Sequence, residues 1–173
     1  MARHSELVKI PRIDLYVTKL ALGTAPMGGW PATVAESDAE ATILAATVSG
    51  INYFDTAPLY GHGVAERRLG AGLNKSGKKI VISTKVGRVL NKVDPNNPVP
   101  DTSLSGFADK DPDVVPVFDF SRDAILRSIE GSLKRLKIDA IDIVYIHDAD
   151  DRIGEAITNS YPVLDEPLSL IHI

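Results

Sequence analysis

Stretches of strand length alternate with segments of helical periodicity along this chain, and this alternation restricts its fold more than any other feature. The strand-like stretches are short and mostly apolar, and they occupy residues 19–23, 51–55, 80–85 and 141–147. In the intervals between them, apolar residues recur at the spacing of one helix face. Strands that alternate with helices form βα units, whose strands lie parallel in one sheet. The sequence therefore predicts an α/β fold.

Three helices are expected between these strands. Residues 37–40 have the capping-box sequence Ser-Asp-Ala-Glu, which predicts a helix with Ser37 as its N-cap and an end before Gly50. Residues 65–73 carry apolar side chains at every fourth position and predict a second helix. The third is expected to start after Ser121, which has the chemistry of an N-cap.

Two further segments lie outside this alternation. Residues 10–18 precede the first strand and are compatible with a small hairpin. Residues 88–118 are rich in Pro, Asp and Asn and show little periodicity, which predicts a long inserted loop. Structureless loops of that length are uncommon inside compact domains. We therefore interpret residues 88–118 as a functional excursion or a partly disordered segment.

Charge and hydrophobicity exclude several classes of protein. The 173 residues include 19 Lys and Arg against 23 Asp and Glu, and 44% of them are hydrophobic, so the chain can bury a core. No basic run offers a footprint for nucleic acid or an anionic membrane surface. No apolar stretch reaches the roughly 20 residues that span a bilayer, and residues 1–10 lack the apolar region of a signal peptide. We expect a cytoplasmic protein.

Cysteine is absent from the sequence, which excludes disulfides, thiolate metal ligands and cysteine nucleophiles. The four histidines, His4, His62, His147 and His172, are scattered without the spacing of metal ligands. We therefore expect no metal site, and any redox chemistry would need a bound cofactor.

Three of the expected strands end in an ionisable residue, Asp55, Lys85 and His147. The carboxyl ends of parallel strands are where ligands and catalytic groups collect. Tyr60 follows Asp55 by five residues, so its phenol can reach the same edge. A tyrosine of ordinary pKa near 10 is a poor acid at neutral pH, and a neighbouring ammonium favours its phenolate form. The four side chains together suit proton transfer to a carbonyl oxygen.

Each of these residues also has a structural interpretation. Asp55 could cap a turn, and the ring of Tyr60 could pack on the rim of the sheet. Lys85 could be a solvated strand end, and His147 could be a buried histidine with a local partner. Chance would rarely place three ionisable residues with unrelated roles at successive strand ends, which favours the catalytic interpretation.

Several segments resemble the aldo-keto reductase family. Its first signature is similar to residues 50–57, to the following Tyr60-Gly61 and to the Glu-Arg-Arg-Leu-Gly of residues 66–70. The Ser-Thr-Lys of residues 83–85 matches the strand that carries the family's lysine, and residues 138–148 match the strand that carries its histidine. The resemblance runs from about residue 19 to residue 150.

The resemblance implies a (β/α)₈ barrel and hydride transfer between NAD or NADP and a small carbonyl or lactol carbon. Carried over by position, the catalytic tetrad is Asp55, Tyr60, Lys85 and His147. Tyr60 would be the proton donor, or the base in the oxidative direction. The nicotinamide would lie near Gly23, Thr24 and Asp55.

Within the family, residues 58–70 resemble bacterial dehydrogenases of small aldoses, such as L-fucose, and of pyridoxal. Substrate contacts are expected from Trp30, Tyr60 and His147, although a lone tryptophan is as often a packing residue. His62 is expected to face solvent rather than the pocket. The alternative from another functional class is a noncatalytic regulatory subunit that senses nicotinamide, as the family's channel β-subunits suggest.

A (β/α)₈ barrel needs about 250 residues, and this chain supplies about half of it. We interpret residues 1–157 as a truncated half barrel of about four parallel strands and residues 158–173 as an aberrant tail. Residues 168–173 match the translation of an adapter used in DNA sequencing, and a genuine short tail is the alternative. The chain is expected to lack useful activity and to self-associate through its open sheet edges.

Overall fold

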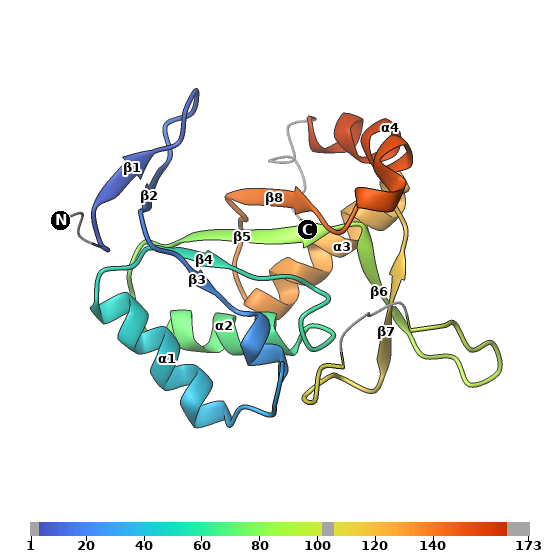
Figure 1. Ribbon diagram of the computed structural model, residues 1–173, viewed down its shortest axis with the longest axis horizontal. Coiled ribbons are helices and arrows are strands. Elements are labelled where there is room, and N and C mark those ends of the chain that lie inside the picture. The colour runs from blue at the N-terminus through green and yellow to red at the C-terminus, as the bar shows by residue number, and fades with distance from the viewer. Residues whose placement is uncertain (1–3, 102–105, 166–173) are drawn as a thin grey trace.

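A computed structural model describes residues 4–101 and 106–165 of the chain. Its centre is a parallel sheet of four strands (Figure 1), in the order β3 (Leu22–Gly23), β4 (Tyr53–Asp55), β5 (Val81–Val86) and β8 (Ile143–Ile146). All three neighbouring pairs are parallel. The predicted α/β fold with a parallel sheet is confirmed.

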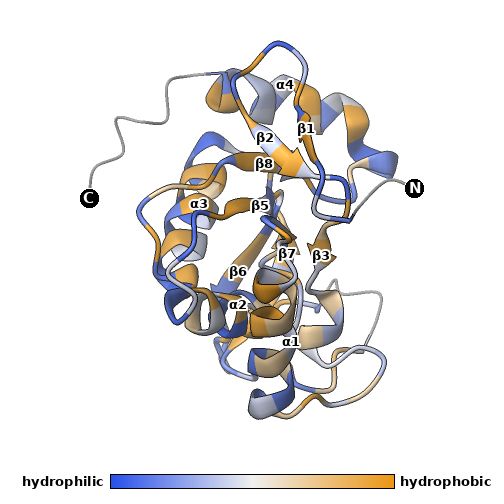
Figure 2. Ribbon diagram, turned by 90° about the vertical axis from the view of Figure 1, so that its left-hand side faces the viewer, coloured by the Kyte–Doolittle hydropathy of each residue, from blue (hydrophilic) through white to orange (hydrophobic). Residues whose placement is uncertain are grey.

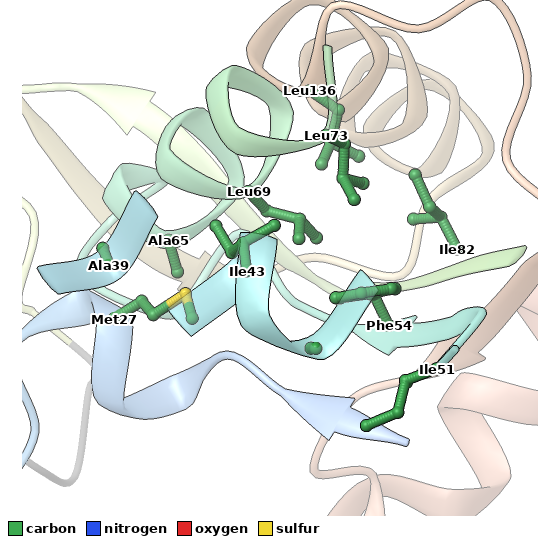
Figure 3. Close-up of a cluster of buried hydrophobic side chains, with 11 residues drawn as sticks. Met27, Ala39, Ile43, Ile51, Phe54, Ala65, Leu69, Leu73, Ile82 and Leu136 are labelled. Atoms are coloured by element: carbon green, nitrogen blue, oxygen red, sulfur yellow. The ribbon is translucent and has the colours of Figure 1, made fainter. Parts of the chain in front are cut away.

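Helices cover one face of this sheet (Figure 1). They are α1 (Glu36–Val48), α2 (Val64–Asn74) and α3 (Arg122–Leu136), with α4 (Ile153–Leu164) beside β8 and α3. Figure 2 shows hydrophobic residues along β3, β5 and β8. The main core lies between sheet and helices (Figure 3), where Ile43, Phe54 and Leu69 are fully buried. Their burial from water stabilises this layer at about 25 cal/mol per Å² of apolar surface.

Strand geometry separates the core from the opposite face of the sheet. Phe54 is buried under the helices, whereas its neighbours Tyr53 and Asp55 are half-buried and point to the other side. On that side the hydroxyl of Tyr53 lies 3.2 Å from the hydroxyl of Tyr145 on β8. The face without helices is therefore the one that carries polar side chains.

The start of α1 differs from the expectation. The helix begins at Glu36 with Ala35 as its N-cap, which has no capping side chain of its own, so the prediction of Ser37 as N-cap is wrong. The carbonyl of Ala35 accepts the first helical bonds, from Asp38 and Ala39. Glu36 and Asp38 lie in the first turn, where negative charge is favourable. For α3 the prediction is confirmed, since the side chain of Ser121 accepts from the amide of Ala124.

Residues 88–118 are not a loop throughout. Their two ends form an antiparallel pair, β6 (Arg88–Lys92) and β7 (Val114–Phe118), and only the connection between these strands is irregular where the structure describes it. The expectation of a loop is wrong at both ends, because Val89 and Val115 bury their side chains there. A second hairpin, β1 (Leu7–Lys9) with β2 (Tyr16–Thr18), precedes β3. It was expected within residues 10–18, but its first strand lies before residue 10.

Helix α4 crosses the boundary expected at residue 157. It continues to Leu164, and Val163 packs with Val86, Ile125 and Ile129 in a second core cluster. Residues 158–165 are therefore helical or directly follow the helix, and residues 168–173 lie outside the described residues. In the described part of the chain, no helix has the length and apolar character that crossing a membrane requires.

Candidate active site

The carboxyl edge of the sheet brings together the residues expected there. Asp55 is the last residue of β4 and Lys85 lies near the end of β5, while His147 follows β8 directly. The strand register pairs Asp55 with Ser83 and Lys85 with Tyr145. Because the strands are parallel and in register, their polar ends meet on one rim.

Asp55 and Lys85 form an ion pair across β4 and β5. Lys85 Nζ lies 2.7 Å from Asp55 Oδ2 and donates a second bond of 2.9 Å to the carbonyl of Thr56. The other carboxylate oxygen, Oδ1, accepts a bond of 2.6 Å from the hydroxyl of Ser83. Both carboxylate oxygens thus have a donor, and the ammonium is held in one place.

Tyr60 lies over this ion pair on the loop between β4 and α2. Lys85 Nζ is 4.7 Å from the centroid of its ring, within the range of a cation–π interaction. The His147 ring meets the Tyr60 ring edge to face at 5.8 Å, and Phe107 packs on it at 6.2 Å. The loop that carries Tyr60 packs closely against Gly28, where an added Cβ would lie 2.6 Å from the Tyr60 carbonyl carbon.

His147 is the group whose ionisation the site changes most. The pKa of His147 is lowered to about 4, chiefly by burial; Asp148 and Asp55 oppose this shift, whereas the charges of Lys85 and Arg88 add to it. The imidazole is therefore neutral at pH 7. Its Nδ1 is buried and has no hydrogen-bond partner among the residues that the structure describes, and its Nε2 lies 3.7 Å from Asp148 Oδ1. A neutral imidazole can donate one hydrogen bond to a ligand oxygen.

The proposed cofactor residues lie beside Asp55 at the end of β3. Gly23 pairs with Asp55 in the register, and a Cβ on Gly23 would meet no atom of the described residues within 4 Å, so the rim formed by these residues is open there. The buried Thr24 donates to the Asp55 carbonyl from its amide (2.9 Å) and from its hydroxyl (3.0 Å). Thr24 thus joins the ends of the two strands.

Two other residues lie differently from the tetrad. Trp30 is 48% exposed, and within the described residues no ring contact joins it to Tyr60 or His147. His62 is buried at 2% exposure and its Nδ1 bonds to the carbonyl of Val114, so the expectation of a solvent-facing residue is wrong. The hairpin of β6 and β7 covers it.

Glu66, part of the motif that resembles the family signature, has a structural place. Its side chain is fully buried between α2, α3 and β5. One oxygen accepts 2.8 Å from the hydroxyl of Thr84, and the other accepts 2.6 Å from Nε of Arg135. Glu66 therefore ties α2 to α3 and to the strand that ends in the lysine.

Sequence reasoning missed three residues of this site. Ser83 supports Asp55, and its position two residues before Lys85 on the same strand face could have indicated it. Phe107 and Arg88 come from the segment interpreted as a loop, and nothing in their local sequence indicates a place beside Tyr60 or behind His147.

Half of a parallel α/β barrel with an acid, a tyrosine, a lysine and a histidine on its carboxyl rim defines the class of protein. The chain belongs to the aldo/keto reductase family, whose sequence profile matches residues 19–164. It is 40% identical over 153 residues to the pyridoxal 4-dehydrogenase of Microbacterium luteolum, covering 83% of this chain and 43% of that protein. It is 36% identical over 159 residues to the D-threo-aldose 1-dehydrogenase of a Pseudomonas species, covering 88% and 46%.

Solved structures agree with the partial barrel. The glycerol dehydrogenase of Gluconobacter oxydans superposes with a TM-score of 0.61 at 32% identity, covering 82% of this chain and 39% of that one. The holo form of an aldo-keto reductase from Bacillus halodurans superposes with a TM-score of 0.64 at 26% identity, covering 88% and 44%. The chain spans less than half the length of each of these relatives.

Proposed function

We propose that this chain is half of an NAD(P)-dependent oxidoreductase that transfers a hydride between a nicotinamide and a small carbonyl or lactol carbon. The observation that carries the proposal is the cluster at the carboxyl rim, in which Lys85 bonds to Asp55 and lies against the Tyr60 ring, with the His147 ring edge to face with the same phenol. The family and the dehydrogenases named above support it. They do not favour a noncatalytic regulatory subunit.

In the proposed mechanism Tyr60 moves the proton. Its hydroxyl gives a proton to the substrate oxygen in reduction and takes it back in oxidation. The ammonium of Lys85 stabilises the phenolate that remains, and Asp55 orients that ammonium. His147, neutral at pH 7, donates a hydrogen bond to the substrate oxygen and so orients it.

The residues on the rim fit a nicotinamide. The open space over Gly23 lies beside Asp55, where a flat ring could approach the backbone without meeting a side chain. Gly23, Thr24 and Asp55 would hold that ring. When bound, the cofactor supplies or accepts the hydride.

The substrate we propose is a small aldose, such as L-fucose, or pyridoxal. Two relatives carry dehydrogenase names for D-threo-aldoses and pyridoxal, and a third is the L-galactose dehydrogenase of Arabidopsis thaliana. Trp30 would form a wall for the sugar ring. A panel of L-fucose, D-arabinose, L-galactose, pyridoxal and simple aromatic aldehydes, assayed with NAD and with NADP, tests this proposal. Reaction with the aromatic aldehydes alone would contradict it.

Turnover tests the proton donor. The assay needs a closed barrel, so we would join this chain through α4 to the second half of the Microbacterium luteolum relative. Tyr60→Phe in this chimera should remove most of the turnover and leave nicotinamide binding nearly unchanged. Tyr161→Phe, on the exposed side of α4, is the matched control. Unchanged turnover in Tyr60→Phe would exclude Tyr60 as the donor.

A further inference from the structure

A buried cation lies behind His147 and has no part in the mechanism above. Arg88 begins β6, and only 2% of its side chain is exposed. Its Nη2 donates a bond of 2.8 Å to Oδ2 of Asp148, the residue that follows His147. Asp148 has a φ of 47°, in the left-handed region that residues with a Cβ rarely adopt. The bond to Arg88 holds the carboxylate of Asp148 in place.

Arg88 is itself held by the β6–β7 hairpin. The register pairs Arg88 with Phe118, and the guanidinium carbon lies 3.9 Å from the centroid of the Phe118 ring. The carbonyl of Gly87, just before β6, accepts a bond of 3.1 Å from the amide of Asp119, just after β7. A planar guanidinium stacked on an aromatic ring has little freedom to turn. Asp148 is therefore anchored to a fixed cation.

The other oxygen of Asp148 faces the imidazole. Asp148 Oδ1 lies 3.7 Å from Nε2 of His147, whereas Nδ1 is buried and no atom in the described part of the chain bonds to it. A negative oxygen favours the tautomer whose N–H faces it. The carboxylate therefore keeps the hydrogen of the neutral ring on Nε2, and the position of the carboxylate decides how strongly it does so.

We propose that Arg88 is a positioning residue for His147: it anchors Asp148 at a distance from which the carboxylate favours the hydrogen on Nε2 but does not bond to it, so that this hydrogen stays available to a ligand. The value of that hydrogen as a donor to substrate rests on the proposed function. The coupling of Arg88 through Asp148 to His147 does not depend on that function. Four charged side chains face the ring, namely Asp148, Lys85, Arg88 and Asp55. Arg88 opposes Asp148 both directly and by holding its carboxylate away from hydrogen-bond distance.

Hydrogen exchange at the imidazole C2 carbon, followed by mass spectrometry, tests the coupling in the 173-residue chain without any need for turnover. It reports the ionisation midpoint of His147 in any state of association. Arg88→Met should raise this midpoint by about one pH unit, because the released carboxylate can then reach Nε2. Arg88→Lys, which keeps a cation, should stay close to the unaltered chain. Arg152→Met is the matched control: Arg152 lies 5.0 Å from the same Phe118 ring, and its carboxylate partner is Glu155.

If Arg88→Met unfolds the chain, Asp148→Asn tests instead how Asp148 acts on the ionisation midpoint of His147. Unfolding raises the midpoint towards the ordinary value of about 6.5. Asp148→Asn removes a charge that favours the imidazolium, so it should lower the midpoint, which is the opposite sign. Amide exchange of β8 in the same samples reports folding.

Three results would overturn the proposal. One is an unchanged midpoint in a folded Arg88→Met chain, and another is an equal rise in Arg152→Met. The third is a rise from Arg88→Met that is just as large when Asp148→Asn is also present. None of these depends on catalysis, so loss of the proton-donor assignment in the chimera would leave this coupling intact.

Discussion

The ammonium of Lys85 on β5 lies 2.7 Å from Oδ2 of Asp55 on β4, while Oδ1 of the same carboxylate accepts a bond from Ser83. Asp55 thus orients the ammonium of Lys85 and is itself held by Ser83 on the neighbouring strand. The pair is partly shielded from water, with 14% of the Lys85 side chain exposed and 28% of Asp55. The same ammonium lies over the ring of Tyr60.

Asp55→Asn tests whether this pair contributes to catalysis. The amide keeps the size of the side chain and loses the negative charge that orients Lys85, so turnover of the chimera should fall about a hundred-fold. Asp14→Asn is the control, because it removes a carboxylate from an exposed ion pair with Lys9 that lies outside the candidate active site. Equal turnover in the two variants would mean that the Asp55 charge has no catalytic role.

The stability of the chain should depend on pH through His147. Its folded pKa of about 4 lies below the unfolded value near 6.5. Between these values the unfolded chain binds a proton that the folded chain does not, so the free energy of unfolding falls as the pH falls, by about 3 kcal/mol in total. Urea unfolding from about pH 7 to about pH 5 should show a steeper fall than in His147→Gln.

His4→Gln is the matched control for that measurement. His4 is exposed and its Nε2 lies 2.8 Å from the carbonyl oxygen of Ser49, so its removal should leave the steep part of the pH dependence in place. If His147→Gln and the unaltered chain lose stability in parallel, His147 is not held neutral by the fold.

Local patterns predicted the sheet because the signals were themselves local. The run of β-branched residues in β5 and the four-residue repeat in α2 each lie within one element. The ionisable strand ends followed from the rule that parallel strands meet at one edge, and the structure brings Asp55, Lys85 and His147 to that edge. Their catalytic roles stay predictions.

What could not be predicted depends on contacts between distant segments. The pairing of β6 with β7 joins residues on either side of a long connection, and no periodicity within either strand indicates its partner. The burial of His62 follows from the same pairing, since its partner is the carbonyl of Val114 at the start of β7. For α1, a correct capping motif was present, and the helix nevertheless begins one residue before Ser37.

Gly70→Ala should destabilise the chain although Gly70 lies inside α2. In an exposed helix, alanine is more favourable than glycine by about 1 kcal/mol. Here a Cβ would overlap the backbone carbonyl of Leu136 at the end of α3, which cannot move as a side chain would. We expect a loss of about 2 kcal/mol in the free energy of unfolding, measured with urea.

Gly154→Ala provides the comparison for that prediction. Gly154 lies in α4, and within the described residues a Cβ there would meet no atom closer than 4 Å. This substitution should raise the free energy of unfolding by about 0.5–1 kcal/mol. The same sign of change at both glycines would contradict the close contact between α2 and α3.

The two edge strands of the main sheet are expected to drive self-association of the chain. In the described part of the chain, β3 and β8 each have one neighbour, so each presents a row of backbone donors and acceptors to whatever lies beside it. Next to the β8 edge, Tyr145 is 46% exposed and Ile143 is half-buried, on the face that has no helix. Such an edge pairs readily with another strand.

We therefore expect the 173-residue chain to form dimers or larger assemblies in solution and to bind NADPH weakly. Tyr145→Lys places a charge beside the β8 edge and should shift the chain towards monomer, because a buried unpaired ammonium disfavours strand pairing. Tyr161→Lys makes the same chemical change on the exposed side of α4 and should leave the assembly unchanged. Light scattering gives the size, and fluorescence titration gives the NADPH affinity. A monomer that binds NADPH at micromolar concentration would show that the half barrel is sufficient by itself.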